Sequence, residues 1–121
     1  MSTRSVIAIE NSDGTLTGVY CHHDGYTEHH APILKNNYDT EEKIRELLSF
    51  GDMSILEKSI KTCVFYNRDR GEDAADVKAD TYDTFKNLNT ARWDCEYFYI
   101  FRNNSWECYD ADGLTISLKK Y

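Results

Sequence analysis

Apolar and polar residues alternate over the first part of the chain, and this pattern predicts a β-hairpin. The runs SVIAIEN (5–11) and LTGVYCH (16–22) repeat with a period of two, which is typical of strands with one buried face. The residues between them include Asp13 and Gly14, which tolerate the positive φ angles of a tight turn. We therefore expect two neighbouring antiparallel strands here.

The second of these strands runs directly into the segment YCHHDGYTEHH. His22–Asp24 is expected at the end of the strand, and Gly25 provides the break after it. A first helix should then begin between Glu28 and Pro32 and end near Asn37, because proline is tolerated in the first helical turn.

A second helix is indicated by the spacing of apolar residues. Ile44, Leu47 and Leu48 follow the i, i+3, i+4 pattern, which places their side chains on one helical face. Asp39, three residues before a glutamate, is the expected N-terminal cap, and Gly51 fits the C-terminal stop.

The middle of the chain is expected to contain a strand, a loop and a short helix. KTCVFYN (61–67) has the composition of a strand and leads into the turn RDRG (68–71). The polar, acidic stretch 72–80 is expected to form a flexible loop. Asp80 is then expected to cap a short helix over 81–88.

The last part of the chain predicts a second hairpin. CEYFYIF (95–101) and SWECYDA (105–111) are joined by the turn residues Asn103 and Asn104. Because CEYFYIF is apolar on both faces, we expect it at the centre of the sheet, with the alternating runs beside it or nearer the edges. The final run, LTISLKKY, should form a strand whose apolar residues point to one face: Leu114, Ile116 and Leu118.

Together these elements predict an α+β fold, formed as a single domain over residues 1–121. We expect five or six mostly antiparallel strands, with two or three helices packed on one face of the sheet. The length of 121 residues, the apolar fraction of 40% and the aromatic fraction of 13% suit one folded domain with its own core.

Charge and cysteine content limit the partners and the compartment. The formal net charge of −7 disfavours direct association with nucleic acid, although a local cluster can still bind an anion. The sequence has neither an apolar run that spans a membrane nor a signal-peptide pattern, so we expect a cytoplasmic protein without a membrane partner. The cysteines form no CxxC pair, which argues against a zinc ribbon and favours reduced thiols in the core: Cys21, Cys63, Cys95 and Cys108.

All four histidines lie between positions 22 and 30, which raises the question of a metal site. His22 and His23 point to opposite sides of an extended segment, and His29 and His30 diverge on a helix, so the spacing disfavours a shared metal. We expect no metal and no cofactor. His22 with Asp24 has the chemistry of an acid–base pair, but no nucleophile or oxyanion hole accompanies it. Asp24 also has an ordinary role as a turn residue.

A second polar cluster, YNRDRGED, follows the strand-like run at 61–67. One interpretation is an internally paired surface loop, in which neighbouring carboxylates balance Arg68 and Arg70. The other is an anion clamp, in which two arginines alternate with Asp69 beside Tyr66, whose ring can stack on a base. If the two clusters meet at one sheet edge, we expect Arg68 or Arg70 to reach Asp24 or the backbone near it.

Several segments of the chain resemble a family of small uncharacterised phage and prophage proteins. These segments are TRSVIAIENSDGT, YCHHDGY, EEKIRELLSFGDMS and YNRDRGED, and together they cover most of the chain. The family pattern reads TRSxIA, YCHxDGYP, a helix followed by GDxS, and RDRGE. The shared positions are His22, Asp24, Gly25, Tyr26, Arg68, Asp69, Arg70 and Gly71. His23 and Thr27 stand where relatives often have tryptophan and proline.

The resemblance implies expression in a bacterial cytoplasm and an accessory role, such as countering host defence. We therefore expect a binding protein rather than an enzyme, one that sequesters a small anionic, nucleotide-like ligand. The residues expected to bind this ligand are His22, Asp24, Tyr26, Tyr66, Arg68, Asp69 and Arg70, and none is expected to be catalytic.

Two alternatives stay open at this point. The first is an inhibitor that contacts a host defence protein through a row of carboxylates: Glu72, Asp73, Asp76 and Asp80. The second is a metal-assisted hydrolase or nuclease that uses His22, Asp24 and the nearby histidines. In any of these roles, open strand edges lead us to expect a homodimer.

Overall fold

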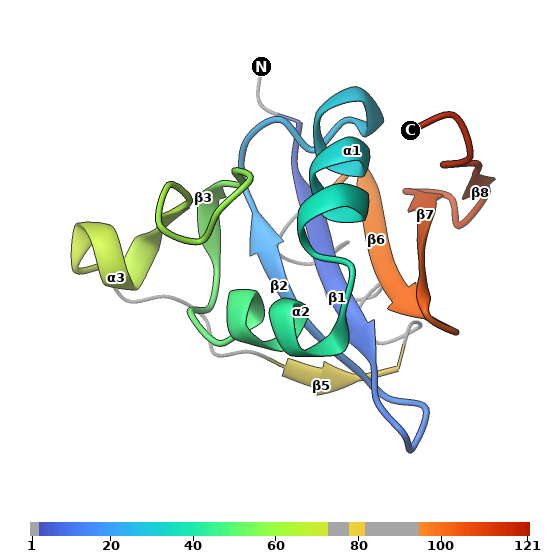
Figure 1. The fold of residues 1–121 in the computed structure, drawn as a ribbon, viewed down its shortest axis with the longest axis horizontal. Helices are drawn as coiled ribbons and strands as arrows, with labels where there is room; N and C mark the ends of the chain where they lie inside the picture. Colours follow the sequence, from blue (N-terminus) through green and yellow to red (C-terminus); the bar gives the residue numbers. More distant parts are fainter. Residues whose placement is uncertain (1–2, 73–77, 82–94) are drawn as a thin grey trace.

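The computed structural model describes residues 3–72, 78–81 and 95–121, and in these residues it contains three helices and eight strands (Figure 1). In chain order the elements are β1 (Ser5–Glu10), β2 (Leu16–Cys21), α1 (Thr27–Asn37), α2 (Glu41–Leu48), β3 (Met53–Ile55), β4 (Val64–Phe65), α3 (Tyr66–Arg70), β5 (Lys78–Asp80), β6 (Tyr97–Arg102), β7 (Ser105–Asp110) and β8 (Thr115–Ile116). The α+β class predicted from the sequence is confirmed.

The strands form one mixed sheet. Its path runs β4-β3-β2-β1-β6-β7-β8, and β5 pairs with β2 beside this path. β1 pairs in parallel with β6 and β2 pairs in parallel with β3, whereas the other pairs are antiparallel. The sheet therefore contains more strands than the five or six expected. Its parallel pairing of β2 with β3 follows from the crossover through α1 and α2, which returns the chain in the same direction.

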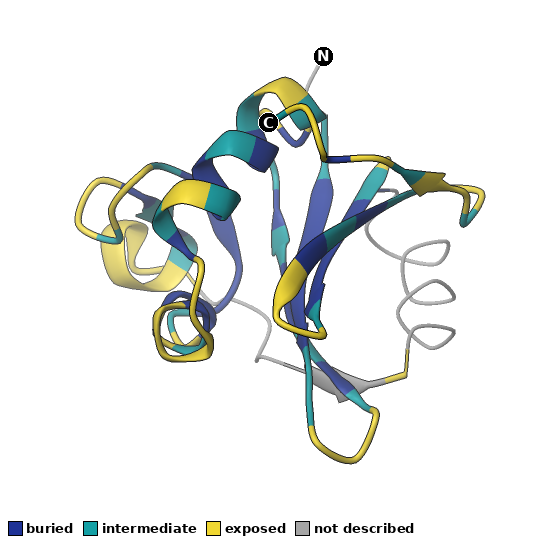
Figure 2. Ribbon diagram, turned by 45° about the vertical axis from the view of Figure 1, so that its right-hand side comes forward, coloured by how far each residue is buried: buried dark blue, intermediate teal, exposed yellow. Residues whose placement is uncertain are grey.

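Helices α1 and α2 cover one face of the sheet, as Figures 1 and 2 show. The main core lies between these helices and the strands. Its strand members include Ile7, Val19 and Phe65, and its helix members include Leu34 and Leu47. Helix α3 lies instead beyond the edge formed by β3 and β4, so two of the three helices match the expected layer.

The other face of the sheet has a second, smaller cluster of buried residues. It includes Val6 and Ala8 of β1 and Phe98 and Ile100 of β6. β6 is therefore buried on both faces, and it lies between β1 and β7. This confirms the central position predicted for CEYFYIF.

Both predicted hairpins are present. β1 and β2 pair along their whole length, as expected from the alternating pattern and the Asp-Gly turn. β6 and β7 are joined by Asn103 and Asn104, whose φ angles of 51° and 62° match the positive values that a two-residue hairpin turn requires.

Helices α1 and α2 differ from the prediction only where they begin. α1 begins at Thr27, one residue before the expected range, and ends at Asn37 as predicted. The N-cap of α2 is Thr40 rather than Asp39, because the Thr40 hydroxyl accepts a hydrogen bond from the Lys43 backbone N–H at 3.3 Å. Asp39 instead forms an ion pair with the Lys43 ammonium at 3.2 Å.

The run 61–67 forms less strand than expected, because only Val64–Phe65 pairs with the sheet. The Asp69 carboxylate accepts a hydrogen bond from the Phe65 backbone N–H at 2.7 Å, which favours a helical turn over a longer strand. Gly71, with a φ of 63°, caps the end of that helix. The RDRG segment is therefore largely helical rather than an open turn.

The stretch 72–80 is also not entirely the loop that was expected, because Lys78–Asp80 forms β5 and pairs with the first half of β2. Two members of the predicted carboxylate row, Asp73 and Asp76, lie outside the described residues. The helix expected over 81–88 also lies outside them, except for Thr81.

The final run is shorter and less regular than predicted. β8 comprises only Thr115–Ile116, Leu118 is buried, and Leu114 is 65% exposed. The expected strand over LTISLKKY, with Leu114, Ile116 and Leu118 pointing to one face, is therefore wrong, because Leu114 and Leu118 lie outside β8. Pairing with β7 ends after two residues, and the chain then leaves the sheet for α1.

The cysteines occupy the positions expected of small core residues, since all four are free and buried. Among the helices of the described ranges, none combines the length and the apolar character needed to cross a bilayer.

Candidate functional site

The end of β2 is joined to β3 by backbone hydrogen bonds. The backbone N–H groups of His22 and His23 donate to the carbonyl oxygens of Met53 and Ser54, at 3.1 and 3.0 Å. β3 in turn pairs with β4, which leads into α3. The segments YCHHDGY and YNRDRG therefore meet at this end of the sheet, with β3 between them.

Asp52 stabilises this corner from inside. It is 7% exposed; its Oδ1 accepts a hydrogen bond from the Tyr20 N–H at 2.9 Å, and its carbonyl oxygen accepts one from the Tyr66 N–H at 3.3 Å. On this edge of β2, β5 pairs with residues 16–18 and β3 pairs with Cys21, so the Tyr20 N–H lies between the two partner strands. The buried carboxylate supplies the acceptor that neither strand provides.

Arg70, the last residue of α3, reaches the same corner. Its guanidinium donates to Ser54 Oγ at 3.4 Å and lies 5.5 Å from the centre of the Tyr66 ring. Its charge also lowers the pKa of His22. Within the described part of the chain, the hydrogen bond of Arg70 goes to Ser54 on β3, beside His23, and not to the Asp24 carboxylate.

Arg68 is engaged elsewhere. Its guanidinium donates to the carbonyl oxygens of Ile60 and Cys63, at 2.9 and 2.8 Å, and to both carboxylate oxygens of Asp69 at 2.9 Å. It also lies 4.7 Å from the centre of the Phe65 ring. Arg68 is therefore internally paired, as one of the two interpretations of the sequence expected. Of the two arginines, Arg70 is the one that contacts β3 beside the end of β2.

Asp24 and Tyr26 lie in the connection from β2 to α1. Asp24 is exposed, with a φ of 59°, and Tyr26 is 40% exposed at the N-terminus of α1. Both side chains are accessible to a ligand. No hydrogen bond or ion pair found among the described ranges joins either of them to Arg68 or Arg70.

Gly25, between these two residues, attaches the connection to the start of the chain. Its N–H donates to the Thr3 carbonyl oxygen at 2.8 Å, and its own carbonyl oxygen accepts a hydrogen bond from the buried Tyr99 hydroxyl at 2.6 Å. A Cβ atom at this position would lie 2.8 Å from Ser5 Cβ and 2.9 Å from the Thr3 carbonyl oxygen. The close approach of the two backbones therefore requires glycine here.

We expect the substitution Gly25→Ala to lower the free energy of unfolding by about 2 kcal/mol, because the new methyl group overpacks a site where the backbone must move to admit it. Urea denaturation measures the loss. The control is Gly71→Ala, where a Cβ meets open space and only the φ of 63° is unfavourable, so the cost should be about 1 kcal/mol. A Gly25→Ala variant as stable as the unsubstituted protein would contradict this account of the corner.

Arg4 is a member of the site that the sequence reasoning missed. Its charge acts to lower the pKa of both Tyr20 and His22. Its Nε is buried and, among the described residues, has no hydrogen-bond partner. The signal that could have found it is the triplet TRS at positions 3–5, which the alternating pattern alone treats as the approach to a strand.

Tyr20 and His22 lie side by side, with the tyrosine hydroxyl hydrogen-bonded to the imidazole Nδ1. Burial raises the pKa of Tyr20 to about 12, so the hydroxyl keeps its proton at neutral pH. Burial is also the main cause of the lowered pKa of His22, and the charges of His23, Arg4 and Arg70 add to it. The residues that meet here are named the cationic cluster below: Arg4, Tyr20, His22, Ser54, Tyr66 and Arg70.

The cationic cluster has the chemistry of an anion-binding site. It combines two guanidinium groups with hydroxyl donors, and the nearby Asp52 is already bonded to the backbone of Tyr20. Burial raises the pKa of Tyr66 as well, although Ser54 and Arg70 act in the opposite direction, so this hydroxyl also stays protonated. In the described ranges, no three or more histidine, cysteine or acidic side chains gather in a way that would hold a metal ion.

In comparisons with known proteins, no family model, no curated protein and no solved structure matches this chain. The resemblance to phage proteins and the binding roles of the seven residues named from the sequence therefore stay predictions.

Proposed function

We propose that this chain is a binding protein of phage type that sequesters a small anionic, nucleotide-like ligand at the cationic cluster and so counters host defence. The observation that carries the proposal is the balance of charge around His22. Burial lowers the pKa of His22 most, and the charges that add to this effect belong to His23, Arg4 and Arg70; the Arg70 guanidinium also donates to Ser54 Oγ on the neighbouring strand. Such a site favours an anion, even in a protein whose net charge is −7.

The buried Nε of Arg4 supports the same conclusion. A buried donor without an acceptor is costly, and a phosphate oxygen of a ligand would satisfy it. Arg70 offers a second planar set of donors from α3. Arg4 precedes β1 and Arg70 ends α3, far apart in the sequence, so the site exists only when the sheet is formed.

Other predicted residues would contact the less charged part of the ligand. Tyr66 presents an aromatic ring that already lies beside the Arg70 guanidinium, and the exposed ring of Tyr26 is also accessible for stacking. Asp24 and His22 offer hydrogen bonds to polar edges. In this proposal Arg68 and Asp69 bind no ligand atom directly but hold α3 in place.

Isothermal titration calorimetry against a panel of cyclic mononucleotides, cyclic dinucleotides and ADP-ribose derivatives tests the proposal. We expect at least one of these ligands to bind. Arg4→Gln and Arg70→Gln should each weaken that binding about ten-fold or more, because a hydrogen bond to a charged group contributes about 1.5–3 kcal/mol. Arg70→Gln should change the free energy of unfolding by less than about 1 kcal/mol, since the side chain is exposed.

The matched control is Arg45→Gln on α2, where the guanidinium pairs with Glu41 at 2.8 Å and with Asn11 at 2.9 Å, outside the cluster. This variant should bind as the unsubstituted protein does. Failure of the whole panel to bind would remove the proposal, and so would an equal loss of affinity in the Arg45 variant.

The proposal also concerns compartment and assembly. We place the protein in the reducing cytoplasm of a bacterial host, which the four free, buried cysteines support. We further propose a homodimer, because the path of the sheet ends at β4 and β8, two short strands whose outer edges are open to pairing.

A further inference from the structure

The last two strands differ in length, so β8 covers only part of the outer edge of β7. β7 is six residues long, but β8 pairs only with Cys108 and Tyr109. Among the described residues, the first half of β7, Ser105–Glu107, is therefore paired with β6 on one side only.

The chain after β8 is held away from β7 by contacts with α1. Leu118 is buried, and its carbonyl oxygen accepts a hydrogen bond from the Lys35 ammonium at 2.8 Å. The Tyr121 and Thr27 hydroxyls form a hydrogen bond at 3.0 Å. These contacts direct the C-terminal segment toward the helix, so it does not continue the sheet.

The register of the hairpin shows which backbone groups face the open side. Ser105 is paired with Arg102 across the two-residue turn, so its N–H and C=O point toward β6. Alternate residues point the other way: Cys108 pairs with β8, and the Asp110 N–H donates to the Leu114 carbonyl oxygen on that side at 2.9 Å. The N–H and C=O of Trp106 therefore face the open edge, and no backbone hydrogen bond to them from the C-terminal segment is found among the described residues.

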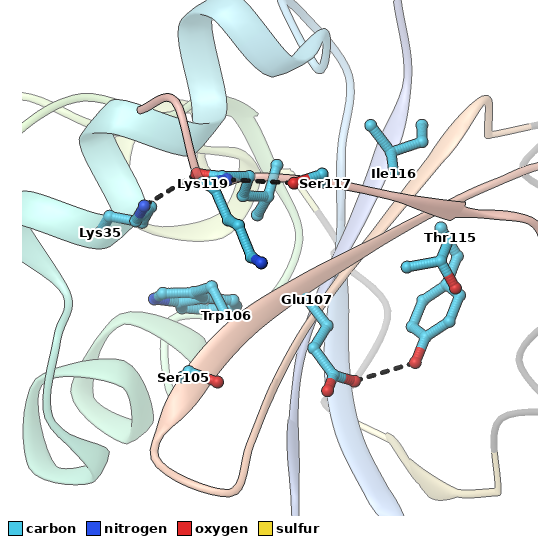
Figure 3. Close-up of a pocket in the computed structure, with 10 residues that line it drawn as sticks. Lys35, Ser105, Trp106, Glu107, Thr115, Ile116, Ser117 and Lys119 are labelled. Carbon is cyan, nitrogen blue, oxygen red and sulfur yellow. Dashed lines mark hydrogen bonds between the residues drawn. The ribbon is translucent and has the colours of Figure 1, made fainter.

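A pocket of about 690 Å³ lies along this open edge (Figure 3). Trp106 and Ile116 give it an apolar part, and the Lys119 side chain reaches over it from the C-terminal segment. Lys35 and Lys119 are its cationic residues. Among the described residues that line it, Glu107 supplies the carboxylate; Glu107 accepts a hydrogen bond from the Tyr109 hydroxyl at 2.9 Å and forms an ion pair at 3.2 Å with Arg102, which also lies 3.5 Å from Glu10.

We infer that the open edge of β7 binds an extended acidic peptide segment of a partner protein, which adds to the sheet as a further strand. The Trp106 backbone supplies the hydrogen bonds, as in other cases of strand addition. Trp106 itself is only 8% exposed and its Nε1–H is bonded to the Tyr38 carbonyl oxygen, so the half-buried Ile116 supplies the apolar surface for an alternate side chain. Lys119 and the two remaining donors of Lys35 select carboxylates, since Glu107, the acidic residue among the described residues of the pocket, already pairs with Arg102, which it shares with Glu10.

Hydrogen exchange in the free protein tests the open edge itself. The amide of Trp106 should exchange roughly a hundred-fold faster than the amide of Cys108, because Cys108 pairs with β8 whereas the Trp106 N–H points away from β6, its partner strand. Equal protection of the two amides would overturn the inference before any ligand is added.

Binding is tested by NMR titration with a short synthetic peptide in which valine alternates with aspartate. We expect shifts of the Ser105–Glu107 amides and slower exchange at Trp106. Lys119→Glu should weaken the binding about five-fold or more. Lys120→Glu is the matched control, because it makes the same charge change on a side chain that lies over the Tyr121 ring and does not line the pocket.

Three results would overturn the inference. They are no binding of the acidic peptide, equal binding of a peptide with lysine in place of aspartate, and equal binding of a peptide whose backbone amides are methylated. The last result, or the same shifts with inorganic phosphate alone, would identify the pocket as a site for small anions instead.

Discussion

Acidification from pH 6.5 to pH 4 is expected to lower the free energy of unfolding by about 3 kcal/mol through the single side chain His30. The ring is fully buried on α1, with its Nδ1 at 3.0 Å from His29 Nδ1 and its centre 5.3 Å from the Tyr99 ring. Its Nε2 is buried without a hydrogen-bond partner in the described ranges. Burial, and then the charge of His29, lowers the pKa of His30 from 6.5 to about 3.

The direction of the effect follows from proton binding. Below pH 6.5 the unfolded chain protonates His30, whereas the folded chain keeps it neutral until the pH approaches about 3. The unfolded state therefore binds the extra proton, and stability falls by about 1.4 kcal/mol for each pH unit in this window. Above pH 6.5 both states are neutral at His30, so this contribution is constant.

Urea denaturation of the unsubstituted protein and of His30→Leu, each followed from pH 7 to pH 4, isolates this contribution. The leucine variant should lose the steep part of the pH dependence, whatever its stability at pH 7. His29→Gln is the control, because it keeps the buried ring and should keep most of the slope. If His30→Leu shows the same slope as the unsubstituted protein, the buried imidazole is not the group that titrates.

The second large effect is expected at Phe65, where Phe65→Ala should cost about 3–5 kcal/mol of stability. The side chain is fully buried and contacts the Phe50 ring at a centre-to-centre distance of 5.0 Å. The Arg68 guanidinium lies 4.7 Å from the Phe65 ring centre and 5.4 Å from the Phe50 ring centre. The backbone of Phe65 also pairs with Met53, so the residue joins α3 to the sheet.

Equilibrium unfolding in urea measures the loss, and Phe50→Ala is the matched control. Phe50 loses the same ring but is only half buried, so its substitution should cost about half as much. A smaller loss at Phe65 than at Phe50 would contradict the role of Phe65 as the residue that holds α3. Because α3 carries Arg70, Phe65→Ala should also weaken any ligand bound at the cationic cluster.

The parts of the fold predicted from the sequence are those specified by neighbouring residues. The β1–β2 hairpin follows from alternating residues around Asp13-Gly14, and the β6–β7 turn follows from two asparagines that tolerate positive φ. The α2 stripe of Ile44, Leu47 and Leu48 is buried as its spacing predicted. In each case a few consecutive residues contain both the pattern and its physical cause.

The short elements were missed because they depend on distant partners. β3, β5 and β8 have two or three residues each, too few for a period to be recognised. β5 is a strand because β2 offers it an unpaired edge, and the parallel pairing of β1 with β6 joins segments about ninety residues apart in the sequence. No local pattern encodes such pairings.

The same division holds for the candidate site. The sequence by itself determined that His22 lies at a strand end and that a pair of arginines follows a second strand, because both clusters interrupt apolar runs. Only the tertiary structure decided which arginine lies near the end of β2: Arg68 is held by the carbonyl oxygens of Ile60 and Cys63, whereas Arg70 donates to Ser54 on the neighbouring strand, and its charge acts on His22. The tertiary structure also added Arg4 to the site. A single charged residue before a strand has no local pattern, so its role depends on the residues that the folded sheet places beside it.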